Sequence, residues 1–410
     1  MRNCIVAQSG GPTAAINASL AGILEENERS GYFDRIYGAL NGITGIFDRR
    51  FLDLTAKMDD DPAFTKKLAI TPAMYLGSCR YKLAADTEDA SVYEDIFSVF
   101  EKMEIDSFFY IGGNDSMDTV LKISAYAKKT GSGIKVLGIP KTIDNDLMHT
   151  DHTPGFGSAA KYIAASLREV WHDTMIYHVK SVTIVEIMGR DAGWLTAASA
   201  LAREDETTAP HLIYLPEKPF SVPKFLNDLH QLLDNQDNVV VAVSEGIRDK
   251  DGNYLSAGVS TSDTFGHSQL SGAGKALELL VKEAFRVKVR SIEVNILQRC
   301  AGHMASKMDL TEAAALGAHA VKCASEGLSG HMMIIDRLGN EPYTTQMATY
   351  PIEKIANGVR SVPLSFINEE GNDVTGEMLA YLRPLIEGEP KISYKDGLPE
   401  YLSVRHLIKR

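Results

Sequence analysis

The sequence predicts an α/β fold with mostly parallel sheets, and two observations support this prediction. Short apolar, β-branched runs recur along the chain, and each is followed by a glycine- or acid-rich turn and then a helical pattern. The runs are continuous rather than alternating, as expected for parallel strands that are buried on both faces. Such sheets bind ligands beyond their carboxyl ends. The pattern therefore favours an enzyme over an interaction scaffold.

Five strands are expected in chain order, and each leads directly into a polar turn. The expected strands are 3–7, 108–111, 136–139, 182–187 and 239–243, and the turns are 8–13, 112–116, 140–146, 188–193 and 244–246. A helical pattern over 14–24 follows the first turn. Because the carboxyl ends of parallel strands meet at one edge of a sheet, we expect the turns to lie on that side.

Two stretches carry no recognisable chemistry. Residues 48–70 are charged and weakly patterned, so we expect a surface excursion there. The tail after about residue 361 contains an expected helix near 377–386 and then a polar stretch. Neither a low-complexity linker nor an internal repeat divides the chain.

The composition narrows the classes of partner. The chain has 410 residues, which suggests two or three domains, and a formal net charge of −12. That charge argues against a nucleic-acid or anionic-membrane partner, and no apolar run approaches the ~18 residues that span a bilayer. The four cysteines are scattered without a Cys-x-x-Cys pair, which favours a reducing cytoplasm over a disulfide scaffold or a zinc site.

Two glycine loops follow expected strands. Gly10 and Gly11 could let backbone N–H groups approach a phosphate at a helix N-terminus, although a tight strand–helix turn is the better explanation of a single pair. The loop at 112–116 repeats the geometry and adds Asn114 and Asp115. Asp115 is a candidate Mg²⁺ ligand, and the alternative is a helix N-cap.

The segment around Asp144 and Asp146 is a sharper signal. Carboxylates two residues apart on an extended segment project to the same side, which allows one base and one metal-binding or orienting group. Lys141 places a positive charge nearby, which keeps a carboxylate ionised and can contact a phosphoryl group. The alternative is a solvated acidic turn, but such a turn seldom follows an apolar strand with an adjacent lysine.

Several cationic and acidic residues are evidence for a functional site only when they are considered together. Each of Arg80, Arg190, Glu245, Arg290 and Arg299 is more often structural when considered alone. With two Gly-Gly loops and an Asp-x-Asp segment beside lysine, they describe phosphoryl transfer, which depends on positioning and charge neutralisation. No Walker P-loop, Gly-x-Ser-x-Gly or strand-end Gly-x-Gly-x-x-Gly occurs, so nucleotide-hydrolase, serine-hydrolase and dinucleotide-binding interpretations fall away.

At this point the sequence resembles the phosphofructokinase family, and specifically its pyrophosphate-dependent branch. The motifs that carry the resemblance lie in the family's order over about residues 3–330: Ser9-Gly10-Gly11-Pro12, Gly112-Gly113-Asn114-Asp115-Ser116, Pro140-Lys141-Thr142-Ile143-Asp144-Asn145-Asp146, Met188-Gly189-Arg190, Ser244-Glu245-Gly246 and Gln298-Arg299. The resemblance implies Mg²⁺-dependent, reversible transfer from pyrophosphate to the 1-hydroxyl of fructose 6-phosphate, giving fructose 1,6-bisphosphate and phosphate in glycolysis or gluconeogenesis.

The resemblance also implies an architecture. We expect two similar Rossmann-like three-layer domains with the active site in the cleft between them. The donor domain would comprise residues 1–139 and about 299–355, and the sugar-phosphate domain 140–298 and about 356–410. A homodimer or homotetramer is implied, because Arg290 matches an arginine that the family lends to a neighbouring subunit.

Residue roles are carried over by position. Asp144 would be the base, with Lys141, Asp115 and Thr142 as further catalytic residues, and Asn114, Asp115 and Asp146 would hold Mg²⁺. Gly11 and Arg80 would contact the donor phosphates. The remaining substrate-binding positions are Thr142, Ile143, Asp144, Met188, Gly189, Arg190, Glu245, Arg290 and Arg299.

Donor choice depends on two positions. In the ATP-using members of the family that this sequence resembles, glycine stands at the positions of Asp115 and Lys141. A carboxylate at 115 would lie where the α-phosphate of ATP must go, so repulsion and bulk would exclude the nucleotide. Lys141 can balance charge on a transferring or leaving phosphate. We therefore expect pyrophosphate as donor, with an ATP-dependent kinase and a non-catalytic sugar-phosphate sensor as the alternatives.

Three positions depart from the family's pattern. Asn114 replaces a usual acidic Mg²⁺ ligand, Ser181 replaces a second subunit-crossing arginine, and Ile296 stands where ATP-dependent members have histidine. The sugar is accordingly less well specified than the reaction, and sedoheptulose 7-phosphate is an alternative acceptor.

Overall fold

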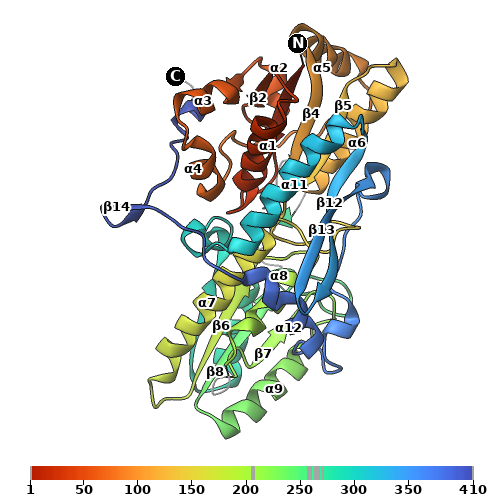
Figure 1. Cartoon of the computed structure of the whole chain (residues 1–410). Helices are drawn as coiled ribbons and strands as arrows, with labels where there is room; N and C mark the ends of the chain where they lie inside the picture. Colours follow the sequence, from red (N-terminus) through yellow and green to blue (C-terminus); the bar gives the residue numbers. More distant parts are fainter. Residues whose placement is uncertain (1, 205–207, 256–260, 263–267, 270–271, 409–410) are drawn as a thin grey trace.

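The computed structural model describes residues 2–204, 208–255, 261–262, 268–269 and 272–408. Two main sheets dominate it, one in the upper and one in the lower half of the view in Figure 1, and helices flank both. The expected α/β class with mostly parallel sheets is confirmed. No helix in the described ranges is long and apolar enough to cross a membrane.

The first sheet has seven strands in the order β13-β12-β5-β4-β1-β2-β3. Its central pairs are parallel, whereas β3 and β13 close the two edges in antiparallel fashion. The strands are β1 (Asn3–Gln8), β2 (Arg35–Ala39), β3 (Phe51–Asp53), β4 (Ile105–Gly112), β5 (Lys135–Pro140), β12 (His331–Asn340) and β13 (Tyr343–Pro351). The three strands expected in this part of the sequence are thus confirmed.

Alternate residues of β1 enter different cores on the two faces of this sheet. Cys4 and Val6 pack with α1, α4 and α11, whereas Ile5 and Ala7 pack with α2, α5 and α6. The helices of this half are α1 (Ile16–Ser30), α2 (Thr44–Phe47), α3 (Leu54–Asp60), α4 (Phe64–Ile70), α5 (Ala90–Lys102), α6 (Asn114–Thr130) and α11 (Lys307–Ser325). Burial on both faces explains the continuous apolar runs in the sequence.

Residues 48–70 are not the expected surface excursion. They form β3, α3 and α4, and Leu54, Phe64 and Leu68 are buried in the core that these elements share with α1. Each short helix contributes only one or two buried apolar residues. Such a small contribution gives no readable helical period over a window of 11–18 residues, which is why the pattern looked weak.

The second sheet has four parallel strands in the order β11-β6-β8-β7. They are β6 (Ser181–Ile187), β7 (Leu212–Tyr214), β8 (Asn238–Ser244) and β11 (Lys288–Glu293). One face packs on α7 (Phe156–Met175), α8 (Trp194–Ala198) and α12 (Gly376–Leu382), and the other packs on α9 (Val222–Asn235) and α10 (Ala273–Ala284). The two strands expected here are confirmed.

Short elements complete the described chain. Two small antiparallel pairs join β9 (Thr261–Ser262) to β10 (Ser268–Gln269) and β14 (Tyr394–Lys395) to β15 (Leu398–Pro399). The 3₁₀ turns are η1 (Ser199–Ala202), η2 (Asn295–Gln298), η3 (Gly302–Met304), η4 (Ile352–Lys354), η5 (Leu364–Phe366), η6 (Arg383–Ile386) and η7 (Arg405–Leu407). The expected helix near 377–386 corresponds to α12 followed by η6.

The end of the chain returns to the first half of the molecule. Leu402 and Leu407 pack against the core of the first sheet, and the His406 ring bonds to the carbonyl of Tyr75 at 2.7 Å. In Figure 1 the C-terminus lies near α3, on the same side as the N-terminus. The expected division assigns the whole tail, including these residues, to the sugar-phosphate domain.

A buried ion network joins the two halves at the start of α7. Asp309 on α11 accepts hydrogen bonds from the backbone N–H groups of Gly155 and Ser158, both at 2.9 Å, and so caps that helix. The His152 ring lies between Asp151 at 2.8 Å and Glu312 at 2.7 Å. Burial opposes a charged imidazole, but these two carboxylates outweigh it and raise the pKa of His152 to about 9.

Helices α1 and α11 approach each other so closely that glycines are required at their crossing. A Cβ at Gly22 would lie 1.9 Å from the carbonyl oxygen of Ala314, and a Cβ at Gly317 would lie 2.0 Å from that of Ser19. The contacts are to backbone, which cannot rotate away. Since α1 begins just after the Gly10–Gly11 turn, this packing also fixes the position of that turn.

We predict that Gly22→Ala destabilises the protein by about 1–3 kcal/mol through overpacking. This loss should appear although alanine favours a helix over glycine by about 1 kcal/mol. Gly376→Ala is the matched control, because Gly376 begins α12 and a Cβ added there would have no heavy atom within 4 Å. Urea unfolding followed by circular dichroism measures both, and equal stability of the two variants would contradict the packing argument.

Candidate active site

The polar turns after β1, β4, β5 and β6 converge on two adjoining hollows. The larger hollow is lined by Gly10, Gly11, Gly113, Asn114, Asp115, Ser116, Lys141, Thr142, Asp144, Asp146, Arg190, Asp191 and Val359. The smaller hollow is lined by Gly11, Pro12, Thr13, Lys141, Thr142, Ile143, Asp144, Met188 and Arg299. Four residues line both hollows, namely Gly11, Lys141, Thr142 and Asp144. Most of the residues predicted from the sequence are therefore brought together.

Lys141 lies beneath the first glycine turn. Its buried ammonium group donates a hydrogen bond to the carbonyl oxygen of Gly11 at 2.6 Å. Gly10 has a φ of +80°, and a Cβ there would lie 3.2 Å from the Lys141 Nζ atom, so glycine meets both a conformational and a spatial demand. Burial lowers the pKa of Lys141 to about 8, although the Asp144 carboxylate opposes that shift.

Asp144 and Asp146 face the larger hollow from the turn after β5. The Thr142 hydroxyl accepts a hydrogen bond from the Asp144 backbone N–H at 3.1 Å, which fixes the turn. Burial raises the pKa of Asp144, and the charges of Lys141, Arg190 and Arg299 counteract this rise. Burial and then the Asp144 charge raise the pKa of Asp146 to about 7. This pair of carboxylates favours an additional cation.

Asn114 adds a neutral oxygen beside Asp146. Its Nδ2 atom donates to the Asp146 carboxylate at 3.4 Å, while its Oδ1 atom is buried without a hydrogen-bond partner. An unpartnered buried oxygen is costly unless a ligand satisfies it. Asp115 follows in the first turn of α6, where it is exposed at the larger hollow. These oxygens fit a hard divalent cation.

The smaller hollow is shaped by the turn after β6. The Met188 N–H faces the Gln298 Oε1 atom at 3.4 Å, and the Gly189 N–H donates to Glu245 at 3.3 Å. Burial raises the pKa of Glu245 to about 8, with the Gly189 hydrogen bond opposing the rise. Gly246 must be glycine, because a Cβ there would lie 1.9 Å from the carbonyl oxygen of Arg190.

Arg299 joins the smaller hollow to the glycine turn. A Cβ at Gly11 would lie 3.4 Å from the Arg299 Nη1 atom, and Arg299 Nε is buried without a hydrogen-bond partner. An arginine with an unsatisfied buried donor is poised to bind an anion.

Four predicted residues do not line either hollow, namely Gly189, Glu245, Arg80 and Arg290. Glu245 accepts a hydrogen bond from the Gly189 N–H in the loop that carries Met188 and Arg190. Arg80 is exposed, on a loop that the Ser78 hydroxyl ties to the Gly10 carbonyl at 2.8 Å. Arg290 lies on the edge strand β11 and pairs with Asp173 at 2.9 Å, so the structure does not bring it to the site of its own chain.

Three lining residues lie outside the motifs singled out in the sequence, namely Thr13, Asp191 and Val359. Asp191 lines the larger hollow and accepts from Arg190 at 2.9 Å and from Arg248 at 2.6 Å. Its place directly after Met188-Gly189-Arg190 was a usable signal. Val359 enters the same hollow from a loop after β13, and no motif marks it.

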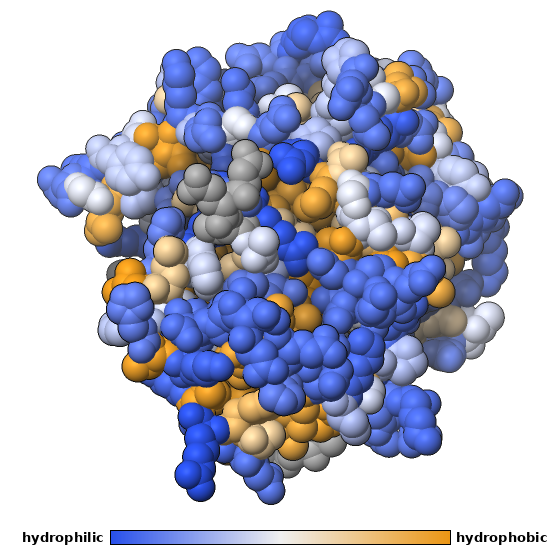
Figure 2. Space-filling view, turned by 90° about the horizontal axis from the view of Figure 1, so that it is seen from below, coloured by the Kyte–Doolittle hydropathy of each residue, from blue (hydrophilic) through white to orange (hydrophobic). Residues whose placement is uncertain are grey.

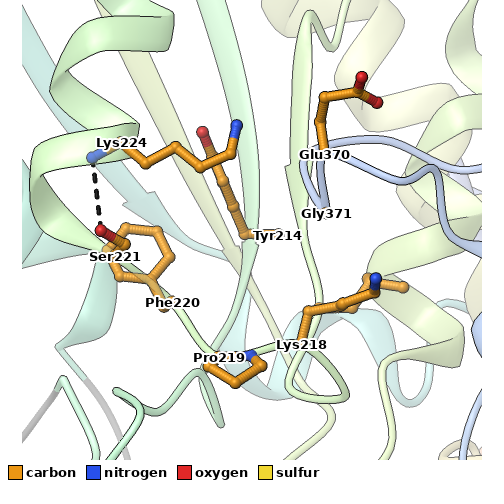
Figure 3. Close-up of a pocket in the computed structure, with 9 residues that line it drawn as sticks. Tyr214, Lys218, Pro219, Phe220, Ser221, Lys224, Glu370 and Gly371 are labelled. Carbon is orange, nitrogen blue, oxygen red and sulfur yellow. Dashed lines mark hydrogen bonds between the residues drawn. The ribbon is translucent and has the colours of Figure 1, made fainter.

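A third hollow lies apart from these residues (Figure 3). It is lined by side chains around Lys218 and Lys224 together with Glu370 and Gly371, and it contains none of the predicted site residues. The hydrogen bond drawn there joins the Ser221 hydroxyl to the backbone N–H of Lys224 and caps α9.

Comparison with known proteins agrees with this geometry. A pyrophosphate–fructose 6-phosphate 1-phosphotransferase of Xanthomonas campestris pv. campestris is 40% identical over 99% of this chain and 96% of its own length. The crystal structure of a pyrophosphate-dependent phosphofructokinase from Nitrosospira multiformis is similar with a TM-score of 0.87 and 38% identity, covering 98% of this chain and 95% of that one.

A second crystal structure, of a pyrophosphate-dependent phosphofructokinase from Marinobacter aquaeolei, is similar with a TM-score of 0.86 and 36% identity. It covers 98% of this chain and 95% of that one. The family model described as phosphofructokinase matches residues 3–324, which include every turn that lines the two hollows except the loop that carries Val359. The chain therefore belongs to the phosphofructokinase family.

Proposed function

We propose that this chain transfers a phosphoryl group from pyrophosphate to the 1-hydroxyl of fructose 6-phosphate, reversibly, giving fructose 1,6-bisphosphate and phosphate. One observation carries the proposal: Lys141, Thr142 and Asp144 line both hollows, so a carboxylate and a cation lie between two ligand spaces. This arrangement suits phosphoryl transfer, because its catalysis consists largely of positioning and charge stabilisation. The names of the full-length relatives support the same reaction.

In the proposed mechanism the larger hollow takes the donor and the smaller one takes the sugar. The Asp144 carboxylate accepts the proton of the attacking hydroxyl, and a positioned base of this kind contributes about 10²–10⁴-fold to the rate. The Lys141 ammonium, held by the Gly11 carbonyl, stabilises negative charge on the transferring and leaving phosphates. Met188 and Arg299 bind the sugar phosphate from the smaller hollow.

We propose Mg²⁺ as the divalent metal, held by Asn114, Asp115 and Asp146. The buried, unpartnered Asn114 Oδ1 supports a ligand at this point. Within the described residues, no group of three His, Cys, Asp or Glu side chains is placed to hold a metal. A site with few protein ligands suits Mg²⁺, because this ion keeps several waters and takes phosphate oxygens as ligands. When bound, the ion would neutralise charge on the phosphates.

We propose that Asp115 selects pyrophosphate over ATP. Its carboxylate is exposed at the larger hollow, in the first turn of a helix whose N-terminus would otherwise attract a phosphate. An ATP-dependent 6-phosphofructokinase of Streptomyces coelicolor is also related, at 27% identity. The ATP-dependent reaction is accordingly the alternative.

The proposed assembly is a homodimer or homotetramer. The edge strand β11 carries Arg290, and exposed apolar side chains flank the sheet edge at Ile176, Tyr177, Ile296 and Leu297. Figure 2 shows that hydrophobic groups gather in patches between hydrophilic ones on the lower face of the molecule. A neighbouring copy would cover apolar surface and receive Arg290.

The proposed domain division follows the two sheets. Residues 1–139 with about 299–355 form the donor domain, and 140–298 with about 356–410 form the sugar-phosphate domain. A cytoplasmic location is also proposed, which fits the four free cysteines.

The donor assignment is tested with purified protein, fructose 6-phosphate and Mg²⁺, adding pyrophosphate or ATP. We expect turnover with pyrophosphate and none with ATP, and Asp115→Gly should gain measurable ATP-dependent turnover because repulsion and bulk are removed. Formation of fructose 1,6-bisphosphate is followed by coupled spectrophotometry. Turnover of the unaltered protein with ATP alone would contradict the proposed function, and an Asp115→Gly variant still inert toward ATP would contradict the steric explanation. Sedoheptulose 7-phosphate in parallel tests the alternative acceptor.

The base assignment is tested by Asp144→Asn, which keeps the shape of the side chain and removes its basicity. We expect kcat to fall by about 10²–10⁴-fold, with fructose 6-phosphate binding retained in calorimetry. Asp106→Asn is the control, since Asp106 pairs with Lys135 at the opposite end of the strands. A rate for Asp144→Asn close to that of the control would refute the assignment.

A further inference from the structure

Residues 359–362, which follow β13 and η4, run between two loops of the active site. The first loop, residues 142–146, carries Asp144 and Asp146, and the second, residues 188–193, carries Met188 and Arg190. Val359 itself lines the larger hollow. This segment lies beyond the residues matched by the family model, which ends at residue 324.

The backbone of this segment is bonded to both loops. The Arg360 N–H donates to the Asp146 carbonyl oxygen at 2.8 Å, and the Arg360 carbonyl accepts from the Trp194 indole at 3.0 Å. The Glu217 carboxylate accepts from the N–H groups of Gly193 at 2.8 Å and Val362 at 2.9 Å. Gly193 ends the second loop and Trp194 follows it directly, so the segment connects that loop to the first.

The Arg360 guanidinium reinforces the connection. Its Nη1 atom donates to the Thr150 carbonyl at 2.7 Å and also to that of Asp151, just beyond the first loop. Its Nη2 atom donates to the Tyr381 hydroxyl at 3.0 Å, and its planar group lies 4.4 Å from the centroid of the Trp194 ring. A planar, multidentate cation is required for this set of contacts.

The Tyr381 hydroxyl links Arg360 to Asn145, the residue between Asp144 and Asp146. It accepts a hydrogen bond from the Asn145 Nδ2 atom at 2.9 Å and donates to the Asp151 carbonyl at 2.8 Å. Asn145 is fully buried and has a φ of +54°, a conformation that needs support from its surroundings. Its side chain therefore fixes the directions in which Asp144 and Asp146 leave the backbone.

We propose that Arg360 is a positioning residue that holds the base-bearing loop in register with the sugar-binding loop. Arg360 lines neither hollow, so it acts through Asp146, Tyr381 and Trp194 rather than on the substrates. This inference rests on the proposed function, since it concerns the geometry of the same transfer. Displacement of a reacting group by about 1 Å can cost about 10²-fold in rate.

The test compares kcat and KM for three variants with the donor that the unaltered protein turns over. Arg360→Met should lower kcat by about 10²-fold while both KM values stay within a few-fold, because the ligand contacts remain. Arg360→Lys should recover only part of kcat, since an ammonium lacks the fork that reaches both Thr150 and Tyr381. Tyr381→Phe removes one hydroxyl and should lower kcat by about 10-fold with little change in melting temperature.

Arg203→Met is the matched control. Arg203 is also partly buried in this half of the molecule, donates to the Pro210 carbonyl at 3.0 Å and pairs with Asp373 at 2.9 Å, but contacts neither loop. It should lower the melting temperature and leave kcat unchanged. The rate of the unaltered protein in the same assay reports on the proposed function, whereas the ratio of variant to unaltered rate reports on Arg360.

Two results would overturn the inference. One is a kcat for folded Arg360→Met within about three-fold of the unaltered protein. The other is a loss of kcat in Arg203→Met that equals the loss in Arg360→Met at a similar fall in melting temperature. If Arg360→Met does not fold, an unchanged kcat in Tyr381→Phe overturns it instead.

Discussion

The buried ammonium group of Lys141 is the feature on which the rest of the site depends. It projects from the end of β5 and bonds to the carbonyl of Gly11 in the turn after β1, across the intervening strand β4. A buried charge is costly unless it is paired and hydrogen-bonded. The parallel order of these three strands, the close packing of α1 on α11 and the glycine at position 10 all contribute to meeting that requirement.

The charged and polar groups around Lys141 do not fully satisfy one another, and this leaves interactions for ligands to make. Burial raises the pKa of both Asp144 and Asp146, and the charge of Asp144 raises the pKa of Asp146 further. Arg299 keeps an unpartnered buried donor, and Asn114 keeps an unpartnered buried acceptor. A metal ion and phosphate groups would satisfy both kinds of group at once. The net charge of −12 does not describe this local balance, because Lys141, Arg190 and Arg299 lie together at the two hollows.

The sequence allowed most of the fold to be predicted, because strands buried on both faces read as continuous apolar runs, as 182–187 does. Turn residues such as Asp144 and Asn114 could be placed because parallel strands share one carboxyl edge. Contacts made by remote segments could not be predicted. Val359 and Arg360 reach the site from a loop without a motif, and Leu54, Phe64 and Leu68 are too sparse to show a period. The subunit that would receive Arg290 lies outside a single chain.

In the proposed mechanism, a base and a cation lie between a pyrophosphate space and a sugar-phosphate space. Phosphorus NMR of the unaltered protein with fructose 6-phosphate, pyrophosphate and Mg²⁺ tests this most directly, because it resolves every phosphorus species in one spectrum. We expect the pyrophosphate signal to decay while orthophosphate and a sugar 1-phosphate appear in equal amounts. Orthophosphate that appears without a new sugar 1-phosphate would contradict it, because water would then be the acceptor.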